Sequence, residues 1–402
     1  MSKILISLLG TGKSAKNDNN KNEYEKTNYI INNTVYPDEQ FVAMPIIKHF
    51  KIDNVFFIGT NKSMWDNIYE SFGGRNEDYA LALMTKKENS TLVENDLHIL
   101  NTTIIESLGS SKSQCIMVEN GESEEELWYI FERFLKIIEF IDKGDELYID
   151  ITHLFRSLSV MSFIMTEFAK TYKEFKMAGM FYGMLDSNSQ SKIIDLGVFF
   201  ELLDWSRAIS NLRKFGNSYE LKQLINSMEG GEELKKSFSD FSNALSISDV
   251  GAMQNSIKIL KGKIADFDKH HNHIIQLISK DLKDFLKRFD LNSLSIFQFE
   301  LAKWYYENKS YAFSYISLAE ACVSAICEQE GLNSHQLEDR EEAKKILRND
   351  SRFLQWKKVN TIRNNIAHKR ANDGRNIKIQ PNQSVREIET YIKDLNFLFK
   401  KK

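Results

Sequence analysis

Proline and cysteine are both scarce in this sequence, which has 3 of each in 402 residues. So few prolines leave helices uninterrupted, and they predict long helices joined by few irregular segments. Cys115, Cys322 and Cys327 are too few and too widely spaced for a disulfide framework or a zinc ribbon. We therefore expect a reducing compartment, the cytoplasm.

Long apolar runs and a large net charge are also missing. No stretch approaches the ~18 apolar residues of a membrane span, and Met1-Ser2-Lys3 leads directly into an apolar segment without a cleavage site. We expect neither a signal peptide nor membrane contact. The net charge of -3 excludes a polybasic wrapper of nucleic acid and leaves any RNA or DNA contact to a local patch. The length, with 42% hydrophobic residues, predicts two folded domains, which we place at 1–205 and 206–402.

The first half alternates short apolar runs with helical stretches, a pattern typical of a doubly wound α/β domain. The runs are almost continuously apolar, as expected of parallel strands that are buried on both faces. After the first run, Tyr24–Ile31 and Thr34–Tyr36 could pair as a hairpin through Asn32-Asn33, with a solvated loop as the alternative. The predicted sheet strands are Lys3–Leu9, Asn54–Ile58, Gln114–Val118, Glu146–Asp150 and Lys176–Met184.

Polar loops follow three of these strands, at Gly10–Lys13, Gly59–Ser63 and Asp150–Arg156. In doubly wound sheets, ligands collect at the carboxyl ends of the strands, where loops and helix N-termini offer backbone N–H groups. These loops add hydroxyls, an imidazole and cations, which suit phosphate and ribose. The first loop fits neither the P-loop, which needs four residues before its Gly-Lys pair, nor the dinucleotide fingerprint, whose third glycine is missing.

The second half, from about Leu202 onward, loses the strand signals and predicts an all-α domain. Phe297, Leu301, Trp304 and Tyr305 recur at helical spacing, and we expect this stripe in the core and not as a base-stacking platform. The predicted helices are 210–228, 252–268, 274–289, 294–308, 311–330, 341–366 and 385–399.

Two further groups of side chains in this half could bind ions or RNA. His270, His271 and His273 have no carboxylate or cysteine at ligand spacing, so we expect no metal site. Five cations form a local basic cluster in a slightly acidic chain, either as a solvated face or as a grip on an RNA backbone. They are Lys357, Lys358, Lys369, Arg370 and Arg375.

The segment Arg363-Asn364-Asn365-Ile366-Ala367-His368 brings a guanidinium, an amide and an imidazole together within six residues. Helical periodicity before it places Asn364 and His368 at i and i+4, on one face of a helix. Imidazole exchanges protons near neutral pH, and a guanidinium is a fork of donors suited to phosphate oxygens. Such a trio can hold a phosphodiester and move its protons without a metal.

These motifs together resemble the DxTHG group of CRISPR accessory proteins. The resemblance lies in the Ile4–Gly12 start, in Phe57–Thr60 followed by Ser63 and Trp65, and in Asp150-Ile151-Thr152-His153 followed by Arg156. It also lies in the Arg363–His368 segment. Leu154 departs from the glycine of the family pattern, and this residue could reshape the pocket.

The resemblance implies a CARF sensor domain, a Rossmann-like α/β fold, followed by an all-α HEPN ribonuclease domain, with 310–330 as the partner helix of the HEPN motif. It implies a homodimer, which could assemble further, that is activated by cyclic oligoadenylate; we expect cyclic tetra-adenylate, with the six-membered ring as the alternative. No cofactor is implied. Asp150 is expected to fix its turn through the backbone. The residues implied to hold the ring are Gly10, Thr11, Gly12, Lys13, Thr60, Ser63, Thr152, His153 and Arg156.

The implied activity is metal-independent cleavage of single-stranded RNA that leaves a 2′,3′-cyclic phosphate and a 5′-hydroxyl. His368 would help to deprotonate the 2′-hydroxyl or orient the attack, and Arg363 would stabilise the charge on the phosphorane. Asn364 would position His368 or the phosphate. The alternative is a sensor that binds or cleaves the ring, with the helical domain as a dimerisation scaffold. A HEPN toxin that acts on tRNA is a third possibility. A transcription regulator is the least favoured function, because the second half of this sequence contains no convincing recognition-helix motif.

Overall fold

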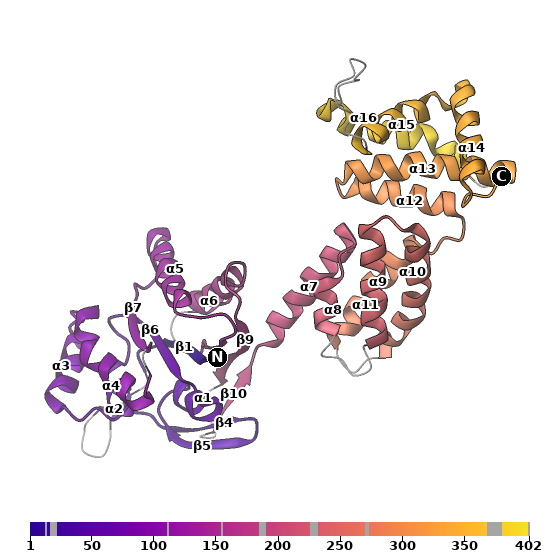
Figure 1. The fold of residues 1–402 in the computed structure, drawn as a ribbon. Helices are drawn as coiled ribbons and strands as arrows, with labels where there is room; N and C mark the ends of the chain where they lie inside the picture. Colours follow the sequence, from indigo (N-terminus) through magenta and orange to yellow (C-terminus); the bar gives the residue numbers. More distant parts are fainter. Residues whose placement is uncertain are drawn as a thin grey trace. The chain divides into compact units, whose positions relative to one another are not determined.

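The computed structural model describes residues 1–12, 14–16, 22–110, 112–153, 156–184, 190–225, 232–269, 273–367 and 380–400. These residues form two compact units, Met1–Glu201 and Leu202–Lys402, which we describe separately (Figure 1). No helix among them is long and apolar enough to cross a membrane.

The N-terminal unit is built on an eight-stranded sheet of order β5-β4-β10-β9-β8-β1-β6-β7. β1 pairs in parallel with β6 on one side and with β8 on the other, and β7 and β9 extend the parallel part outward. The doubly wound α/β class is confirmed. β2 and β3 pair with each other in a separate two-stranded sheet. The strands of the unit are β1 (Lys3–Leu9), β2 (Ser14–Lys16), β3 (Asn22–Tyr24), β4 (Thr27–Ile31), β5 (Thr34–Glu39), β6 (Asn54–Gly59), β7 (Gln114–Met117), β8 (Glu146–Asp150), β9 (Lys176–Met184) and β10 (Gln190–Asp195).

Helices cover both faces of this sheet (Figure 1). Successive residues of β1 alternate between two cores, since Leu5 and Leu9 pack under α1 to α4, whereas Ile4, Ile6 and Leu8 pack under α5 and α6. Burial on both faces explains why the strands read as unbroken apolar runs. The helices are α1 (Ala43–Phe50), α2 (Trp65–Ser71), α3 (Glu77–Glu88), η1 (Glu94–Leu97), α4 (His98–Leu108), α5 (Glu124–Glu139) and α6 (Arg156–Ala169).

The hairpin after β1 is confirmed, because β4 and β5 pair in antiparallel fashion with Ile31 opposite Thr34. Asn32 and Asn33 both have positive φ, at 46° and 67°, as a two-residue type I′ turn requires. The sequence did not predict β10, which joins this hairpin to β9 and widens the sheet.

The C-terminal unit consists of two helical bundles that share α12. Phe297, Leu301 and Trp304 of α12 pack in the core with α7 to α11, whereas Phe299 and Ala302 pack with α13 to α16. The expectation that the aromatic stripe of α12 is core is confirmed. The helices are α7 (Val198–Phe215), α8 (Tyr219–Ile225), α9 (Glu232–Ser246), α10 (Val250–Ile264), η2 (Ala265–Lys269), α11 (His273–Arg288), α12 (Leu294–Glu307), α13 (Tyr311–Glu330), α14 (Leu337–Asn349), η3 (Ser351–Phe353), α15 (Leu354–Ala367), α16 (Pro381–Leu395) and η4 (Asn396–Phe399).

Two predicted helices are wrong in extent. The helix predicted over 341–366 is broken, because Asp350 is extended (φ -90°, ψ 131°) and its carboxylate accepts a hydrogen bond from the backbone N–H of Arg352. That cap ends α14 and allows η3 and α15 to start in a new direction. The helix predicted over 210–228 turns at Gly216, where φ is +66°. α9 was not predicted, although Leu234, Phe238, Phe241 and Leu245 recur in it at helical spacing.

Candidate functional sites

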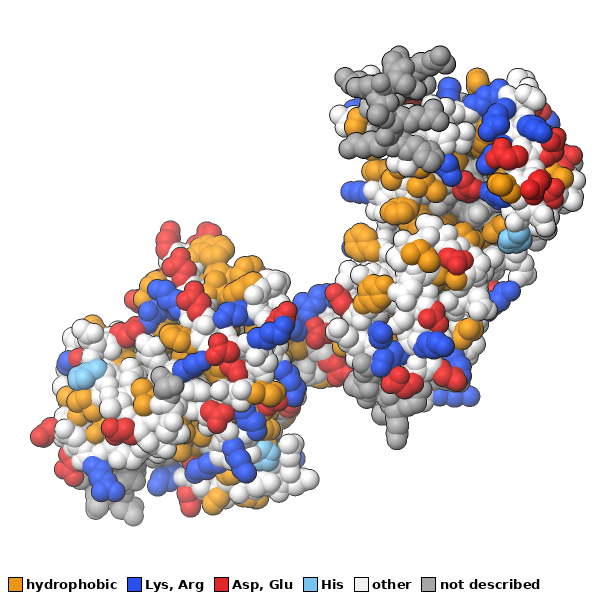
Figure 2. All heavy atoms as spheres, in the orientation of Figure 1, with side chains coloured by type: hydrophobic (Ala, Val, Ile, Leu, Met, Phe, Trp, Pro, Cys, Tyr) orange, Lys and Arg blue, Asp and Glu red, His pale blue; other side chains and the backbone are white. Residues whose placement is uncertain are grey.

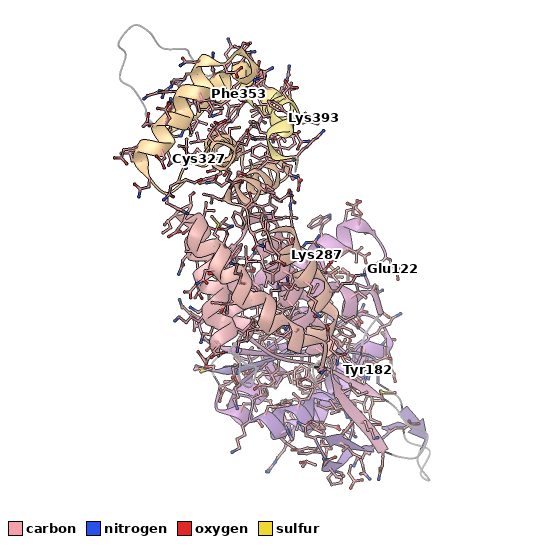
Figure 3. The ribbon with its side chains drawn as sticks, turned by 90° about the vertical axis from the view of Figure 1, so that its right-hand side faces the viewer. Glu122, Tyr182, Lys287, Cys327, Phe353 and Lys393 are labelled. Atoms are coloured by element: carbon pink, nitrogen blue, oxygen red, sulfur yellow. The ribbon has the colours of Figure 1, made fainter. Side chains whose placement is uncertain are left out.

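The helix α15 carries Arg363 and Asn364 and packs against α13. Trp356 and Val359 of α15 are fully buried, and the indole N–H of Trp356 donates to the backbone oxygen of Ala319 at 3.2 Å. Arg363 follows Trp356 by seven residues, which is two helical turns, so it leaves the same face of α15. The packing of these two buried residues therefore aims Arg363 at α13. Figure 3 labels Cys327 of α13, Phe353 just before α15, and Lys393 of α16, which come from this same bundle.

Glu320 of α13 receives Arg363. The Nη2 atom of Arg363 lies 3.0 Å from Oε1 of Glu320, and Nη1 donates to Oδ1 of Asn364 at 3.1 Å. Both side chains of the ion pair are about a quarter exposed, at 29% for the arginine and 26% for the glutamate. The Nε atom of Arg363 is buried and has no hydrogen-bond partner in the described part of the chain. The guanidinium is thus fixed at one end and still has donors to offer.

Arg340 of α14 binds the other oxygen of the same carboxylate. Its Nη2 contacts Oε2 of Glu320, and its Nη1 donates to the backbone oxygen of Ser334 at 3.1 Å. Two guanidiniums therefore share one carboxylate, which leaves the cluster with one net positive charge. A partly exposed cluster of this kind attracts an anion such as a phosphate.

Of the predicted catalytic trio, the structure brings Arg363 and Asn364 together, whereas His368 lies outside the described residues. Lys369, Arg370 and Arg375 of the predicted basic cluster lie outside them as well. The sequence reasoning missed Glu320 and Arg340. A signal for Glu320 was present, since it is the only charged residue between Tyr311 and Cys327. A lone carboxylate inside an apolar helix calls for a partner.

The second candidate site lies at the carboxyl ends of β1, β6 and β8. β1 lies between β6 and β8 in the sheet, so the connections after β1 and after β8 run to opposite sides, and this is the topological switch point. The predicted ligand loops follow these strands, so the fold gathers them at one edge of the sheet. Lys13 and the side chain of Arg156 are outside the described set.

Asp150 fixes the loop after β8. Its Oδ1 accepts from the backbone N–H of Thr152 at 3.0 Å, and its Oδ2 accepts from the hydroxyl of Ser7 at 2.8 Å. The role expected for this aspartate in its own turn is confirmed. The hydroxyl of Thr152 accepts from the backbone N–H of Gly183 at 2.8 Å, which ties the loop to β9.

Ser63 and Thr60 hold the loop after β6 from inside. The hydroxyl of Ser63 is fully buried; it donates to the backbone oxygen of Leu9 at 2.5 Å and accepts from the backbone N–H of Thr60 at 2.9 Å. The indole N–H of Trp65 donates to the backbone oxygen of Thr60 at 2.8 Å. The backbone oxygen of Gly10 accepts from the N–H of Met64 at 3.0 Å, which joins this loop to the one after β1.

His153 follows Thr152 and turns inward. Its Nε2 atom is buried without a hydrogen-bond partner among the described residues. Burial lowers the pKa of His153, and the nearby carboxylate of Asp150 opposes that shift only in part. The imidazole is therefore neutral at physiological pH and offers a hydrogen bond, not a charge.

A partly buried polar cluster supports the Gly10–Gly12 loop. Gly12 has a φ of +74°, and a Cβ there would lie 2.4 Å from a ring carbon of Tyr24. The hydroxyl of Tyr24 donates to Asp66 at 3.0 Å, and Nζ of Lys87 donates to the same hydroxyl at 2.6 Å and to Asp66 at 2.7 Å. The short hairpin β2–β3 is thereby attached to α2 and α3 beside the loop. Burial, assisted by Asp66, raises the pKa of Tyr24.

No group of three or more histidine, cysteine or carboxylate side chains that could hold a metal ion occurs among the residues described. His270 and His271 fall outside them. The three cysteines are free and buried, and burial raises the pKa of Cys115 and of Cys322, which keeps them unreactive thiols.

Sequence comparisons relate the chain to CRISPR-associated proteins. A family model described as CRISPR-associated protein MJ1674, second domain, matches residues 201–293, which span α7 to α11. The chain is 28% identical over 431 residues to CRISPR-associated protein MJ1674 of Methanocaldococcus jannaschii, with 98% of this chain and 66% of that protein covered. The chain thus spans just under two thirds of that relative.

Among solved structures, Enterococcus italicus Csm6 bound to cyclic hexa-2′-fluoro-hexa-dAMP aligns with 99% of this chain and 94% of that chain. The identity is 13% and the TM-score is 0.41. A likeness this distant carries no functional inference.

Proposed function

We propose that this chain is a CRISPR-associated endoribonuclease that cleaves single-stranded RNA and is activated by cyclic oligoadenylate. Three observations support the proposal. The relative from Methanocaldococcus jannaschii is CRISPR-associated. The Arg363–His368 segment resembles a HEPN motif, and polar loops gather at the switch point of an α/β sheet, where such folds bind ligands.

The observation that carries the proposal is the way Arg363 is held. Its guanidinium is fixed by Glu320 and Asn364, and its buried Nε has no hydrogen-bond partner among the residues that the structure describes. The side chain of Arg363 is 29% exposed, so the outer part of its guanidinium remains open to a phosphate oxygen of the RNA. Preorganised donors of this kind stabilise charge that develops in a transition state.

The proposed reaction is attack of an RNA 2′-oxygen on the adjacent phosphorus. His368 accepts the proton of the 2′-hydroxyl, the new P–O2′ bond forms, and the P–O5′ bond breaks. Arg363 stabilises the charge on the equatorial oxygens. The departing 5′-oxygen takes a proton from water, and His368 returns its proton to the hydroxide that this leaves. The products are a 2′,3′-cyclic phosphate and a 5′-hydroxyl. One motif per chain supplies few groups, so we propose a homodimer in which two motifs form the site.

The activator is proposed to bind at the switch-point loops of the N-terminal unit. Asp150, Ser63 and Thr60 position these loops through the hydrogen bonds described above. Thr152, His153 and the backbone N–H groups after β1 are then available to riboses, adenines and phosphates. Cyclic oligoadenylate shifts the population of protein conformations towards the active one only if it binds that conformation more tightly than the inactive one. Two-fold symmetry suits a ring with an even number of adenylates.

A cleavage assay on a fluorescent single-stranded RNA in EDTA tests the proposal. Wild type and His368→Ala are each assayed alone, with cyclic tetra-adenylate, and with cyclic hexa-adenylate. His335→Ala, which removes an exposed histidine of the same bundle, is the matched control. We expect wild type and the control to cleave the RNA only in the presence of one of the two cyclic oligoadenylates. We expect His368→Ala not to cleave it under any condition.

Other outcomes select other functions. Equal cleavage without a ring would retain the ribonuclease and exclude the gating. No cleavage, together with binding or consumption of a ring, would favour the sensor or ring-cleaving alternative. Loss of cleavage in the His335→Ala control as well would point to a folding defect of the bundle and would leave His368 without a specific role.

A further inference from the structure

A hollow of about 270 Å³ opens on the C-terminal unit between the turn after α7 and the start of α13. Its rim carries three aromatic rings that are largely exposed: Phe215 (60%), Tyr219 (45%) and Phe313 (44%). Figure 2 shows hydrophobic side chains gathered on the surface over α12 and α13 of this unit. Exposed apolar groups that gather around a hollow mark a binding site more often than scattered ones do.

The rings stand on a rigid base. Phe313 stacks on Tyr305 with ring centroids 5.3 Å apart and planes at 27°, and Tyr305 packs on Trp304 at 5.0 Å. The indole N–H of Trp304 donates to the backbone oxygen of Arg213 at 2.7 Å. The hydroxyl of Tyr219 donates to Asn243 at 2.8 Å, which fixes a second ring. These rings are held in place before any ligand arrives.

Gly216 leaves the floor of the hollow open. Its φ is +66°, and a Cβ at this position would lie 1.8 Å from a methyl carbon of Leu245 and 3.3 Å from the indole of Trp304. The turn after α7 therefore approaches the ring of Trp304 more closely than a residue with a side chain would allow.

Polar groups complete the lining. Lys214 lines this hollow together with Asn217, Ser246 and Ser310. The described residues provide no ion-pair partner for Lys214. Lys214 also lines an adjoining groove of about 710 Å³, whose other charged lining residues are Arg213, Arg288, Asp281, Asp284 and Glu307. An unpaired nucleotide can use each of these groups. Its base stacks on an exposed ring, its phosphate pairs with the cation, and the edges of its base form hydrogen bonds with amide and hydroxyl groups.

A surface path along α13 connects the hollow with the Arg363 cluster. Phe313 and Glu320 are seven residues apart on α13, so they share one face and lie about 10 Å apart along the axis, the length of about three stacked nucleotides. Ile316 and Ser317 lie between them and are partly exposed. The path runs from an aromatic hollow to the carboxylate that holds Arg363.

We propose that the hollow formed by Phe215, Tyr219 and Phe313 is a subsite for one unpaired nucleobase of the RNA substrate. The subsite holds the strand so that it runs along α13 and presents its phosphodiester to Arg363. It rests on the proposed function in taking RNA as the ligand. Because every base has a π-face, the subsite accepts all four bases and excludes duplexes, whose bases are already stacked.

Binding of RNA by the full chain tests the subsite. Anisotropy of a fluorescein-labelled single-stranded 12-nucleotide RNA is measured in a His368→Ala background, alone and with Phe313→Ala, Phe313→Trp or Phe397→Ala. Phe397 is a matched control, with 47% exposure in the same unit. Base–aromatic stacking is worth about 1–3 kcal/mol, so we expect Phe313→Ala to weaken binding by about 5- to 150-fold. Phe313→Trp retains binding, and Phe397→Ala leaves it unchanged.

A second readout separates the subsite from the chemistry. With His368 intact, Phe313→Ala should raise KM for RNA cleavage and leave kcat near the wild-type value. Unchanged RNA affinity in Phe313→Ala would overturn the subsite while the ribonuclease stands. If wild type does not cleave, the proposed function fails, and the affinities of the His368→Ala series still decide the subsite. If Phe313→Ala lowers the molar mass of the protein in solution and leaves its RNA affinity unchanged, the hollow is a contact between copies of the chain and not a nucleobase subsite.

Discussion

Both carboxylate oxygens of Glu320 are engaged by arginines, so Arg363 has one preferred position before substrate arrives. Glu320→Gln keeps the size of the side chain but removes the charge that holds two guanidiniums. We expect kcat for RNA cleavage to fall on the order of 100-fold, the effect of an approximately 1 Å misplacement of a catalytic group. RNA affinity in a His368→Ala background should change little. Initial-rate kinetics and anisotropy measure the two effects.

Glu328→Gln is the matched control for Glu320. Glu328 lies two turns further along α13, and its carboxylate accepts from the backbone N–H and the hydroxyl of Ser295. Its loss should lower the melting temperature and leave the cleavage rate intact. If Glu320→Gln were instead to cleave RNA without any ring, the carboxylate would be an inhibitor of Arg363 and not its support.

His153 makes the stability of the N-terminal unit depend on pH. Its folded pKa is lowered by burial, whereas the unfolded chain titrates near about 6.5. The unfolded state therefore binds more protons below that pH, and the stability is complete above it and declines as the pH falls through the folded pKa. We expect urea midpoints to fall from pH 7.5 to pH 5.5, and His153→Gln to reduce this slope. His98→Gln, at an exposed site, should retain it.

At the scale of elements, the hydrogen bond from Trp356 of α15 to α13 helps to determine where the Arg363 cluster lies. Trp356→Phe removes the donor to the backbone oxygen of Ala319 and part of a fully buried ring. We expect a loss of roughly 1–3 kcal/mol of unfolding free energy in the C-terminal unit, together with a lower cleavage rate. Denaturant unfolding measures the first effect. Trp128→Phe changes an indole that is 58% exposed and should alter neither.

Elements formed by local pattern were predictable from the sequence, and those formed by a single polar contact were not. β1, β8 and β9 were predicted with the bounds that the structure gives. Burial on both faces makes β1 and β8 apolar runs, whereas β9 has exposed residues towards its end. The break at Asp350 depends on one capping carboxylate in a segment that otherwise has helical periodicity. Within the candidate site, Arg363 and Asn364 stood out as a motif. Glu320 lies 43 residues earlier in the chain, and no periodicity joins the two.

At the scale of the whole molecule, the proposal requires that a change in the N-terminal unit alters chemistry in the C-terminal unit. Gly12→Ala forces a side chain into a left-handed backbone position and against Tyr24. We expect the ring concentration for half-maximal RNA cleavage to rise about tenfold or more, with the same maximal rate at saturating ring. Titration of the activator in the cleavage assay measures this. If the activator concentration for half-maximal cleavage stays the same, the Gly10–Gly12 loop has no part in activation.

The two outer strands of the large sheet bear on how copies of the chain can meet. β5 contains Pro37, which has no N–H to donate, and Asp38, whose φ is +57°, and its register with β4 shifts between Thr27 and Tyr29. β7, at the opposite edge, is four residues long. Interrupted or short edges resist strand-by-strand aggregation. An added chain therefore finds only an interrupted or a short backbone ladder at these two sides, which favours association of copies through side chains on helices and loops.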